Sequence, residues 1–482
     1  MNQFHQFIDQ IQADIAAAWD DDIIPTLCEY IKIPNKSPDF DAHWQENGYM
    51  QLAMTLLHNW AQHQNITGMA TEVIQLPNRT PLMFIEIDGQ KENTILLYGH
   101  MDKQPEMHGW HENKGPWVPV IEDQKLYGRG GADDGYALFS CLNAIGLLQK
   151  YNIPHARCVI IIEGCEESGS YDLKPYLERL QDRIGTPELV ICLDSTAGNY
   201  QQLWSTTSLR GMISGHLSIS VLNEGIHSGM GSGVVPSIEM ILRQLLDRLE
   251  NSATGQIHLP ELTTEIPTQR INEAKIAASM LDQHFISAYP LSGNTQPLSS
   301  DIAELILNRT WRPQLSITGT SGYPDLQHAG NVTIPTATFK LSIRIPPSIT
   351  AATANGAVKA LLEKDPPFGA TITFTPTERA SGWHAPPLAH WLRTACDQAS
   401  QQFFNKNAAY MGEGGLIPFM GMLGRQFPNA QFLITGVLGP HSNAHGPNEF
   451  LHIPTVKKIT GCVASVIAAH YQHATLPANC VH

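Results

Sequence analysis

The sequence predicts an α/β protein built on a mixed sheet that helices cover on both faces, with a smaller α+β domain inserted into it. The chain has 482 residues, more than one hydrophobic core usually holds, so at least two domains are expected. Helix-like and short apolar segments alternate over residues 1–210, and near residue 211 they give way to period-two segments. The first pattern resumes near residue 379. We therefore expect one domain from 1–210 and 379–482, and a second from 211–378.

The first domain supplies the sheet and its covering helices. Hydrophobic residues recur at helical spacing over 22–33, 49–63 and 134–150. Short apolar runs predict strands at 81–87, 94–99, 158–164 and 189–194. They are apolar throughout, which is typical of strands buried on both faces. After the second domain the pattern continues with a helix-like segment and an apolar run at 388–403 and 431–437.

The second domain reads as a split βαβ unit. A strand with one wet face at 215–221 is followed by a helix over 236–250, with Pro236 near its start. Further strands and one further helix follow in the order β-β-α-β, at 314–320, 337–345, 353–364 and 370–376. A long, partly helical insert at 251–313 interrupts the unit.

The composition excludes several classes of partner. The formal net charge is −15, whereas surfaces for nucleic acid or anionic membranes need clustered Lys and Arg. No uncharged stretch is long enough to cross a bilayer, and we expect no signal peptide because the N-terminus lacks a basic region before an apolar core. The eight cysteines are scattered without a C-x-x-C pair, which predicts free thiols in a reducing cytoplasm.

Polar side chains of a restricted kind follow the predicted strands. In open α/β sheets the ligand crevice lies outside the carboxyl ends of the strands, so these side chains are expected to converge. Each alone is common as a turn or cap residue, but together they offer only His, Asp and Glu. They are His100 and Asp102, Glu166 and Glu167, Asp194, His441 and His445, with Asp133 and Asp134 just ahead of a helix.

Imidazoles and carboxylates without thiolates suit zinc, manganese or cobalt. The set exceeds what one catalytic zinc needs and fits two metals roughly 3.5–4 Å apart that share a carboxylate. Asp102 lies two residues after His100, so in extended backbone its carboxylate can accept the imidazole N–H. Of the neighbouring Glu166 and Glu167, one can bind metal while the other acts on a bridging water. Spacing alone does not choose between His441 and His445.

The motifs that carry these residues resemble a known family. The chain is similar to the di-zinc metallopeptidases and amidohydrolases that include carnosinase, cytosolic non-specific dipeptidase, aminoacylase and succinyl-diaminopimelate desuccinylase. The similarity covers nearly the whole chain, inserted lid included, and is closest to the carnosinase-like dipeptidase branch. The matching motifs occur in the family's order: "GHMD", "LYGRGGADD", "EGCEESGS", "LDS", "HSGMGSG", "GEGGLIP" and "AHGPNE".

The resemblance implies a fold and a metal site. The fold would be a di-metal catalytic domain with an inserted lid and dimerisation domain. Asp133 would bridge two divalent ions, most naturally zinc. His100 and Asp194 would complete one site, and Glu167 and His445 the other, the "HGPNE" context favouring His445 over its neighbour.

The resemblance also assigns roles in catalysis. Glu166 would be the general base that takes a proton from the bridging water and returns it to the leaving amine, and Asp102 would orient the imidazole of His100. In the lid, His227 matches the family's histidine that stabilises the oxyanion, often across a dimer. Substrate contacts fall to Arg344, Asn331, Gly414 and Gly415.

The alternation of Arg344 with Phe339, Leu341 and Ile343 independently predicts that its side chain leaves the face opposite the core, where it could clamp a carboxylate. Two positions depart from the family. Gly135-Tyr136 stands where Lys-Gly is usual, and Leu416 replaces a small polar residue. The 251–313 insert is expected to shape either specificity or the dimer interface.

These observations predict a cytoplasmic, homodimeric metallo-dipeptidase that hydrolyses short peptides with a free C-terminal carboxylate by a metal-activated water. The alternative is an N-acyl-amino-acid deacylase with the same chemistry. A two-metal phosphoesterase would need basic residues for phosphate, and the motif loops offer few. A binding protein without catalysis is disfavoured because every expected metal ligand and Glu166 are present.

Overall fold

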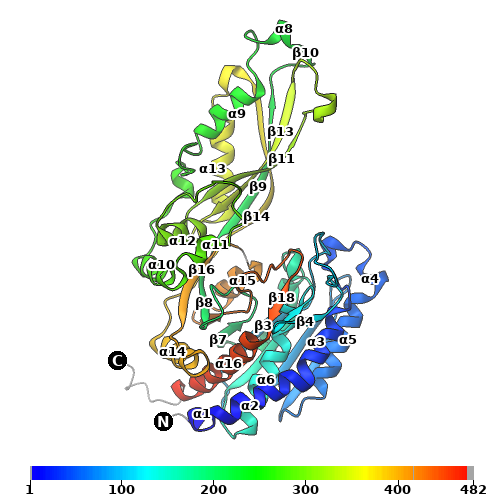
Figure 1. Cartoon of the computed structure of the whole chain (residues 1–482), viewed down its shortest axis with the longest axis vertical. Helices are drawn as coiled ribbons and strands as arrows, with labels where there is room; N and C mark the ends of the chain where they lie inside the picture. The colour runs from blue at the N-terminus through cyan, green and yellow to red at the C-terminus, as the bar shows by residue number, and fades with distance from the viewer. Residues whose placement is uncertain (1–2, 416, 475–482) are drawn as a thin grey trace.

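The computed structural model describes residues 3–415 and 417–474. Figure 1 shows an elongated molecule in which a larger domain holds both ends of the chain and a narrower lid extends away from it. Within the described residues, no helix combines the length and apolar character needed to span a bilayer.

The larger domain is organised around a six-stranded mixed sheet in the order β1-β2-β6-β3-β7-β17. Four neighbours, β6, β3, β7 and β17, pair in parallel, while β1 and β2 complete the sheet with antiparallel pairings. The strand bounds are β1 Met69–Ile74, β2 Leu82–Ile87, β3 Thr94–His100, β6 Arg157–Glu163, β7 Pro187–Cys192 and β17 Gln431–Ile434. The predicted mixed sheet is confirmed; β1 was not predicted, because its residues are mostly half-exposed.

Helices cover both faces of this sheet. In β3 the side chains alternate between two hydrophobic cores: Ile95 and Leu97 belong to one, Leu96 and Tyr98 to the other. The first core is closed by α2 Ile8–Ala18, α3 Ile24–Ile31, α5 Tyr49–Gln62, α6 Ala137–Lys150, α14 His390–Phe404 and α16 Ile453–His473. The second is closed by α7 Leu173–Ile184 and α15 Pro418–Gln426.

The lid is a four-stranded antiparallel sheet in the order β11-β13-β9-β14, with two long helices packed on one face. Its elements are β9 Gly211–Ser220, α9 Ile238–Asp247, β11 Gln314–Ser321, β13 Thr336–Ile345, α13 Ala351–Glu363 and β14 Thr371–Ala380. Along β13 every second side chain is buried, because only one face meets the helices. The predicted α+β insertion of split βαβ type is confirmed.

At the far end of the lid two short strands, β10 Ile226–His227 and β12 Val332–Thr333, pair beside α8 Ser228–Gly231. On the larger domain, a small sheet of β4 Val120–Glu122, β5 Lys125–Tyr127 and β18 Phe450–His452 lies next to the loops that follow the main strands. The short helices α1 Gln3–Gln6 and α4 Trp44–Asn47 complete the N-terminal part.

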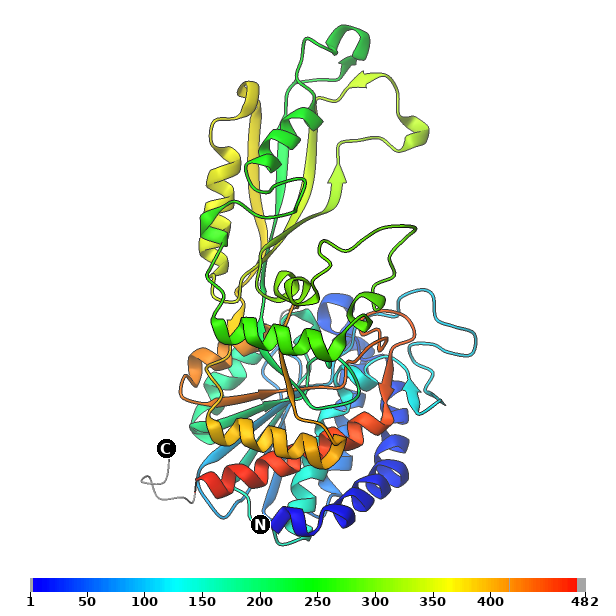
Figure 2. The same cartoon turned by 60° about the vertical axis from the view of Figure 1, so that its left-hand side comes forward.

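The first part of the insert at 251–313 joins the lid core through Ile257, Leu259 and Leu262, whereas its helices pack away from the lid sheet. Its helices are α10 Thr268–Leu281, α11 His284–Ser287 and α12 Ile302–Thr310. They share a hydrophobic core with Trp204 and Met411, which lie on a three-stranded sheet of β15 Trp383–His384, β8 Trp204–Leu209 and β16 Ala409–Glu413. Figure 2 shows these helices lying between the lid sheet and the larger domain. The insert is therefore positioned to contact the space between the two domains.

Candidate metal centre

The end of β3 is fixed to the loop that carries the two aspartates. A Cβ atom on Gly99 would lie 2.5 Å from the Cβ of Ala137 and 2.8 Å from Oδ2 of Asp134, so only glycine allows this approach. The backbone N–H of His100 donates to the same Asp134 oxygen at 3.2 Å. The abrupt end of the apolar run thus reflects a close packing of strand and loop that brings His100 to Asp133.

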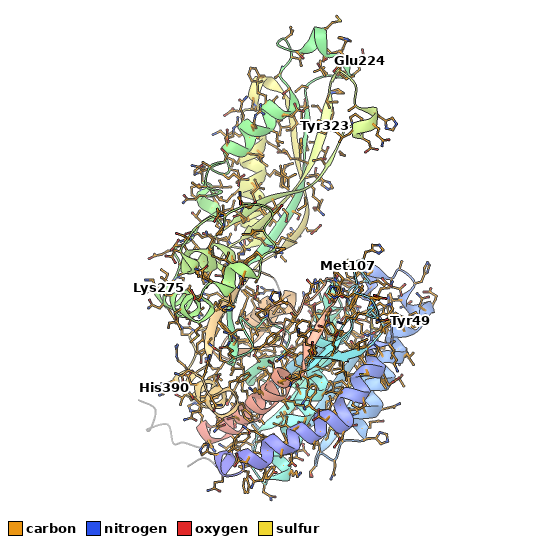
Figure 3. The ribbon with its side chains drawn as sticks, in the orientation of Figure 1. Tyr49, Met107, Glu224, Lys275, Tyr323 and His390 are labelled. Carbon is orange, nitrogen blue, oxygen red and sulfur yellow. The ribbon has the colours of Figure 1, made fainter. Side chains whose placement is uncertain are left out.

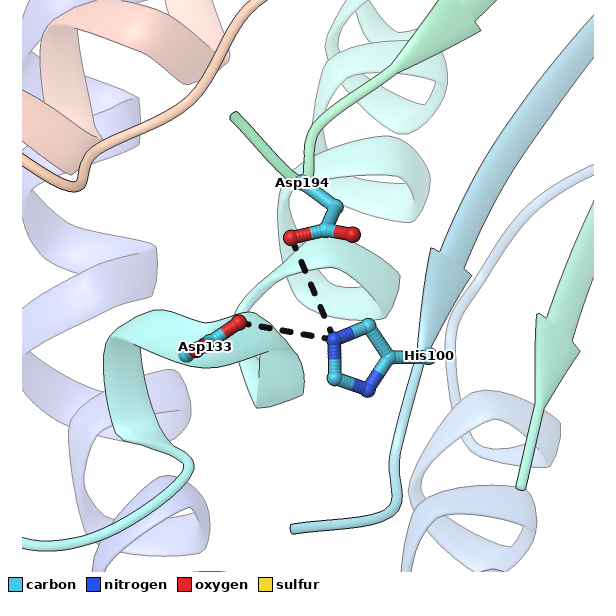
Figure 4. Close-up of side chains that lie close together, drawn as sticks. All are labelled: His100, Asp133 and Asp194. Carbon is cyan, nitrogen blue, oxygen red and sulfur yellow. Dashed lines mark ion pairs between the residues drawn. The ribbon is translucent and has the colours of Figure 1, made fainter. Parts of the chain in front are cut away.

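A first group of donor atoms forms where β3 and β7 end. Nε2 of His100 lies 3.5 Å from Oδ1 of Asp133 and 3.9 Å from Oδ1 of Asp194. Figure 4 shows one imidazole nitrogen of His100 facing both carboxylates. The imidazole is fully buried, and its Nε2 has no hydrogen-bond partner among the described residues.

A second group shares the same aspartate. Oδ2 of Asp133 lies 3.0 Å from Nε2 of His445, which in turn lies 3.3 Å from Oε2 of Glu167. The side chain of His445 is 54% exposed, whereas those of Asp133 and Glu167 are almost completely buried. Asp133 therefore turns one oxygen to each group, and the donor atoms within each group lie within 4.8 Å of one another.

Asp102 connects the histidine to the glutamate pair. Nδ1 of His100 lies 3.1 Å from the backbone carbonyl oxygen of Asp102 and 3.4 Å from its Oδ1. The two carboxylate oxygens of Asp102 accept hydrogen bonds, each of 3.0 Å, from the backbone N–H groups of Glu166 and Glu167. The carboxylate was predicted as the imidazole's acceptor. The structure instead puts the carbonyl nearest and directs the carboxylate to the turn that holds the glutamates.

The electrostatics of the cluster favour a cation. Burial raises the pKa of Glu167 to about 8 and the pKa of Asp194 to about 6, and it raises the pKa of Glu166 well above its usual range. Asp133 behaves in the opposite way: against the effect of burial, the neighbouring imidazoles of His100 and His445 lower its pKa. Gathered and buried carboxylates are costly to ionise unless positive charge lies among them.

The side chains fit a divalent metal ion. Nε2 of His100 and Oε1 of Glu167 are buried polar atoms without a hydrogen-bond partner among the described residues. Both are donors that hard or borderline divalent ions accept, and ligation would satisfy them.

Two neighbours of Asp102 had no predicted task. Nε2 of Gln104 donates to Oε2 of Glu167 at 2.7 Å, which fixes that carboxylate from the side of the β3 loop. The buried ammonium of Lys103 donates to the carbonyl oxygens of Tyr30 and Ile33, at 2.7 and 2.8 Å, and so anchors the end of α3. The only signal for Gln104 was its spacing, since it continues the two-residue period of His100 and Asp102.

The predicted lid residues are not brought to this cluster within the chain. His227 pairs with Val332 across β10 and β12, and the backbone N–H of Ser228 donates to the carbonyl oxygen of Asn331 at 2.9 Å. The imidazole of His227 is exposed, and its Nδ1 accepts from the N–H of Gly229 at 3.0 Å. Figure 1 places β10 at the tip of the lid and β3 in the larger domain.

Figure 3 shows the same separation with side chains. Glu224, close in sequence to the lid histidine, lies at the far end of the lid, whereas Met107, in the loop that leaves the metal cluster, lies on the side of the larger domain that faces the lid. His227 and Asn331 therefore lie together, but away from the donors.

Arg344 lies elsewhere in the lid, on the half-exposed face of β13 near its end. Burial lowers the pKa of Arg344, and burial together with Arg344 and Arg309 lowers the pKa of Arg210 to about 10. The positive charges of Arg344 and Arg309 therefore act on Arg210, and Glu413 is the neighbouring acid that opposes their effect. This is an anion-attracting region at the base of the lid.

The predicted glycine loop follows β16 beside these arginines. A Cβ on Gly414 would lie 2.9 Å from the carbonyl oxygen of Arg309, so its lack of a side chain serves a contact with the insert. At Gly415 the nearest atom, in Glu413, would be 4.0 Å away, which leaves open space beside the backbone. Leu416 lies outside the described residues.

A cavity of about 640 Å³ is lined in part by residues that follow β7 and β17 in the sequence. Its lining includes Thr196, two residues beyond Asp194, and His441. The two histidines of the last loop therefore lie in different places: His445 belongs to the donor cluster and His441 to the cavity wall. The hydroxyl of Thr196 donates to Glu413. The insert supplies a further wall, made by Phe285, Tyr289 and Arg309 among others.

Comparisons with known proteins give relatives in sequence and a shared fold. The chain is 25% identical over 366 residues to a cysteinylglycine-S-conjugate dipeptidase of Corynebacterium striatum, covering 74% of this chain and 76% of that protein. The fold matches human carnosine dipeptidase 1 with a TM-score of 0.75 and 21% identity, over 97% of this chain and 99% of the other. It matches the di-peptidase Dug1p of Saccharomyces cerevisiae with a TM-score of 0.76 and 21% identity, over 98% and 99%.

The predicted resemblance to this group of metallopeptidases is confirmed by a family match over most of the chain. Residues 96–469, which include β3, the lid and the last loop, match Peptidase family M20/M25/M40. The chain belongs to Peptidase family M20/M25/M40.

Proposed function

We propose that this peptidase is a dipeptidase that uses two divalent metal ions to hydrolyse short peptides with a free C-terminal carboxylate. Among the metals that suit these ligands we favour zinc over manganese and cobalt. The observation that carries the proposal is the sharing of Asp133 between two donor groups, one completed by His100 and Asp194 and the other by Glu167 and His445. One carboxylate between two such groups is the arrangement that two-metal hydrolases need.

The bound ions would supply Lewis-acid chemistry, lowering the pKa of a water molecule and polarising the scissile carbonyl. Glu166 would accept the proton from that water as its oxygen attacks the carbonyl carbon. It would then return the proton to the amine as the C–N bond breaks. Two features support this role: its backbone N–H is held by Asp102, and no ion pair of its carboxylate occurs in the described structure.

Arg344 would bind the substrate's C-terminal carboxylate. The region around it contains three guanidiniums, Arg210, Arg309 and Arg344, and burial lowers the pKa values of two of them. Nε atoms of Arg210 and Arg309 are buried without partners among the described residues. An anionic group bound between the lid and the larger domain would compensate the buried positive charge and would accept hydrogen bonds from the unpartnered Nε atoms.

His227 would donate a hydrogen bond to the carbonyl oxygen as negative charge develops on it, and Asn331 would contact the substrate backbone. Both lie at the far end of the lid, so we infer a homodimer in which the lid of one subunit reaches the metal cluster of the other. Support comes from exposed apolar side chains on the lid, which isolated proteins rarely leave uncovered: Met230, Val234, Leu326, Val332 and Phe368.

We further infer that the protein acts in the cytoplasm. In the described part of the chain the cysteines are free thiols, most of them buried, as expected for a protein of a reducing compartment.

The names of the relatives favour peptides over acylated amino acids, since those compared above are dipeptidases. The test is hydrolysis by the zinc-loaded protein of dipeptides beside N-acetyl and N-succinyl amino acids. We expect cleavage of dipeptides with a free carboxylate and little cleavage of their C-terminal amides. Cleavage of the acyl compounds alone would replace the dipeptidase assignment with a deacylase.

A further inference from the structure

The two donor groups are supported by different kinds of structure. His100 is the last residue of β3, and Asp194 lies two residues beyond β7, so neighbouring strands hold both. His445 lies in an irregular loop, itself in the left-handed region with φ of 64°. Three other non-glycine residues of this loop share that backbone region: His441, Asn443 and Asn448. Such a loop has no ladder of hydrogen bonds to fix His445 against Asp133.

A buried ion pair ties this loop to the aspartate loop. Nη1 of Arg129 lies 2.5 Å from Oε2 of Glu449, and the two side chains are 1% and 0% exposed. Arg129 lies four residues before Asp133, and Glu449 lies four residues after His445. The pair therefore joins the segments that carry the two ligands facing each other in the second group.

Further hydrogen bonds make this junction rigid. The other oxygen of Glu449 accepts from the backbone N–H of Gly130 at 2.9 Å, and Nη2 of Arg129 donates to the carbonyl oxygen of Gly446 at 2.7 Å. The backbone N–H of Gly128 donates to the carbonyl oxygen of Glu449 at 3.0 Å. Each side chain thus hydrogen-bonds to the backbone of the opposite loop, and the contact of Arg129 is with Gly446, the residue after His445.

Buried ion pairs contribute little net stability, because desolvation offsets their attraction, but they fix geometry through directional hydrogen bonds. We propose that Arg129 and Glu449 are positioning residues that set the distance between His445 and Asp133, and through it the metal affinity of the second group alone. The inference rests on the proposed two-metal function. It assigns independence from this pair to the first group, because His100 and Asp194 lie at strand ends and the loop of Asp133 is held to the end of β3 through Asp134.

A second buried pair in the same chain provides a matched control. Nη1 of Arg270 lies 2.8 Å from Oε2 of Glu273, and both side chains are almost fully buried. Glu273 also accepts from the hydroxyl of Thr207 on β8, and Arg270 donates to the carbonyl oxygen of Ala385. This pair joins α10 to the small sheet of β8 and β15. It matches the first in type and burial but joins no segment that carries a predicted metal ligand.

The test is calorimetric titration of the metal-stripped full-length protein with zinc, for the wild type, Glu449→Gln, Arg129→Lys and the control Glu273→Gln. We expect two sites in the wild type and in the control. In Glu449→Gln and Arg129→Lys one site should weaken about 10- to 100-fold while the other keeps its affinity. Anomalous scattering at the zinc edge should show the lost occupancy beside His445, and excess zinc should restore kcat.

Several results would overturn the inference. They are unchanged affinity at both sites in the two variants, equal weakening of both sites, or the same weakening in Glu273→Gln. Failure of both Glu449→Gln and Arg129→Lys to fold, judged by circular dichroism, would show a general structural role and would also refute it. A wild type that binds fewer than two zinc ions would instead refute the proposed function, which separates the two failures.

Discussion

The donor cluster and the lid differ in whether one chain brings their predicted functional residues to the same site. The cluster draws its side chains from five separate segments of one chain and buries most of them together: His100, Asp133, Glu167, Asp194 and His445. The lid brings His227 and Asn331 together as well, but at its tip, away from the larger domain. Within one chain the fold therefore brings the candidate metal ligands together but leaves the lid residues away from them, and in the proposed homodimer a second subunit would supply the lid residues.

Removal of metal should have the largest effect, because it disables the cluster as a whole. Dialysis against a chelator should abolish dipeptide hydrolysis, and zinc should restore it. Far-ultraviolet circular dichroism should change little, since the cluster lies at the ends of strands whose cores are formed without it. Activity that persists in protein shown to be free of metal by elemental analysis would contradict the two-metal account.

Glu166→Gln comes next, because it removes the proposed base but leaves the donor groups. We expect kcat to fall by about 10³-fold, within the range for loss of a general base. The zinc content should stay at the wild-type value, since Glu166 belongs to neither donor group. Full activity of this variant would refute the mechanism, and loss of zinc would move Glu166 into the set of ligands.

His227→Ala tests the lid side of the comparison. Loss of one hydrogen-bond donor to a developing oxyanion should lower kcat by about 10²-fold. Zinc affinity should not change, because His227 is remote from the cluster within the chain. A change in zinc affinity equal to that of a cluster variant would show that lid and cluster are not separate as described.

Arg344→Lys should have the smallest effect, mainly on KM. Lysine keeps the charge but loses the bidentate geometry, so we expect KM for a dipeptide to rise about tenfold with kcat little changed. The wild type should discriminate between a dipeptide and its C-terminal amide, and the variant should discriminate less. Equal discrimination by both proteins would assign carboxylate recognition to another group, such as Arg210.

Much of the cluster was predictable because its signals are local. An apolar run that ends in His, Asp or Glu marks both the strand and the residue at its carboxyl end, and parallel strands bring such ends together. His100, Glu167 and Asp194 follow from this rule. The predicted strands β3, β6 and β7 are observed within three residues of their expected starts.

What the sequence did not reveal depends on partners that are distant along the chain. Gln104 is defined by its bond to Glu167, and the Arg129 pair spans 320 residues, so neither has a local pattern. The strand β1 lacks an apolar run because it is half-exposed. The insert's helices carry apolar residues, but nothing local indicates that these pack on β8 and β16 and not on the lid.

The most direct test of the account mixes two disabled variants. The Glu166→Gln variant keeps the lid histidine but lacks the general base. The His227→Ala variant keeps the general base and the metal ligands but lacks the lid histidine. If each active site combines the cluster of one subunit with the lid of its partner, subunit exchange should restore about a quarter of wild-type activity, from the one intact site of each mixed dimer. Activity that stays at the sum of the two variants after verified exchange would contradict assembly of the site from two chains.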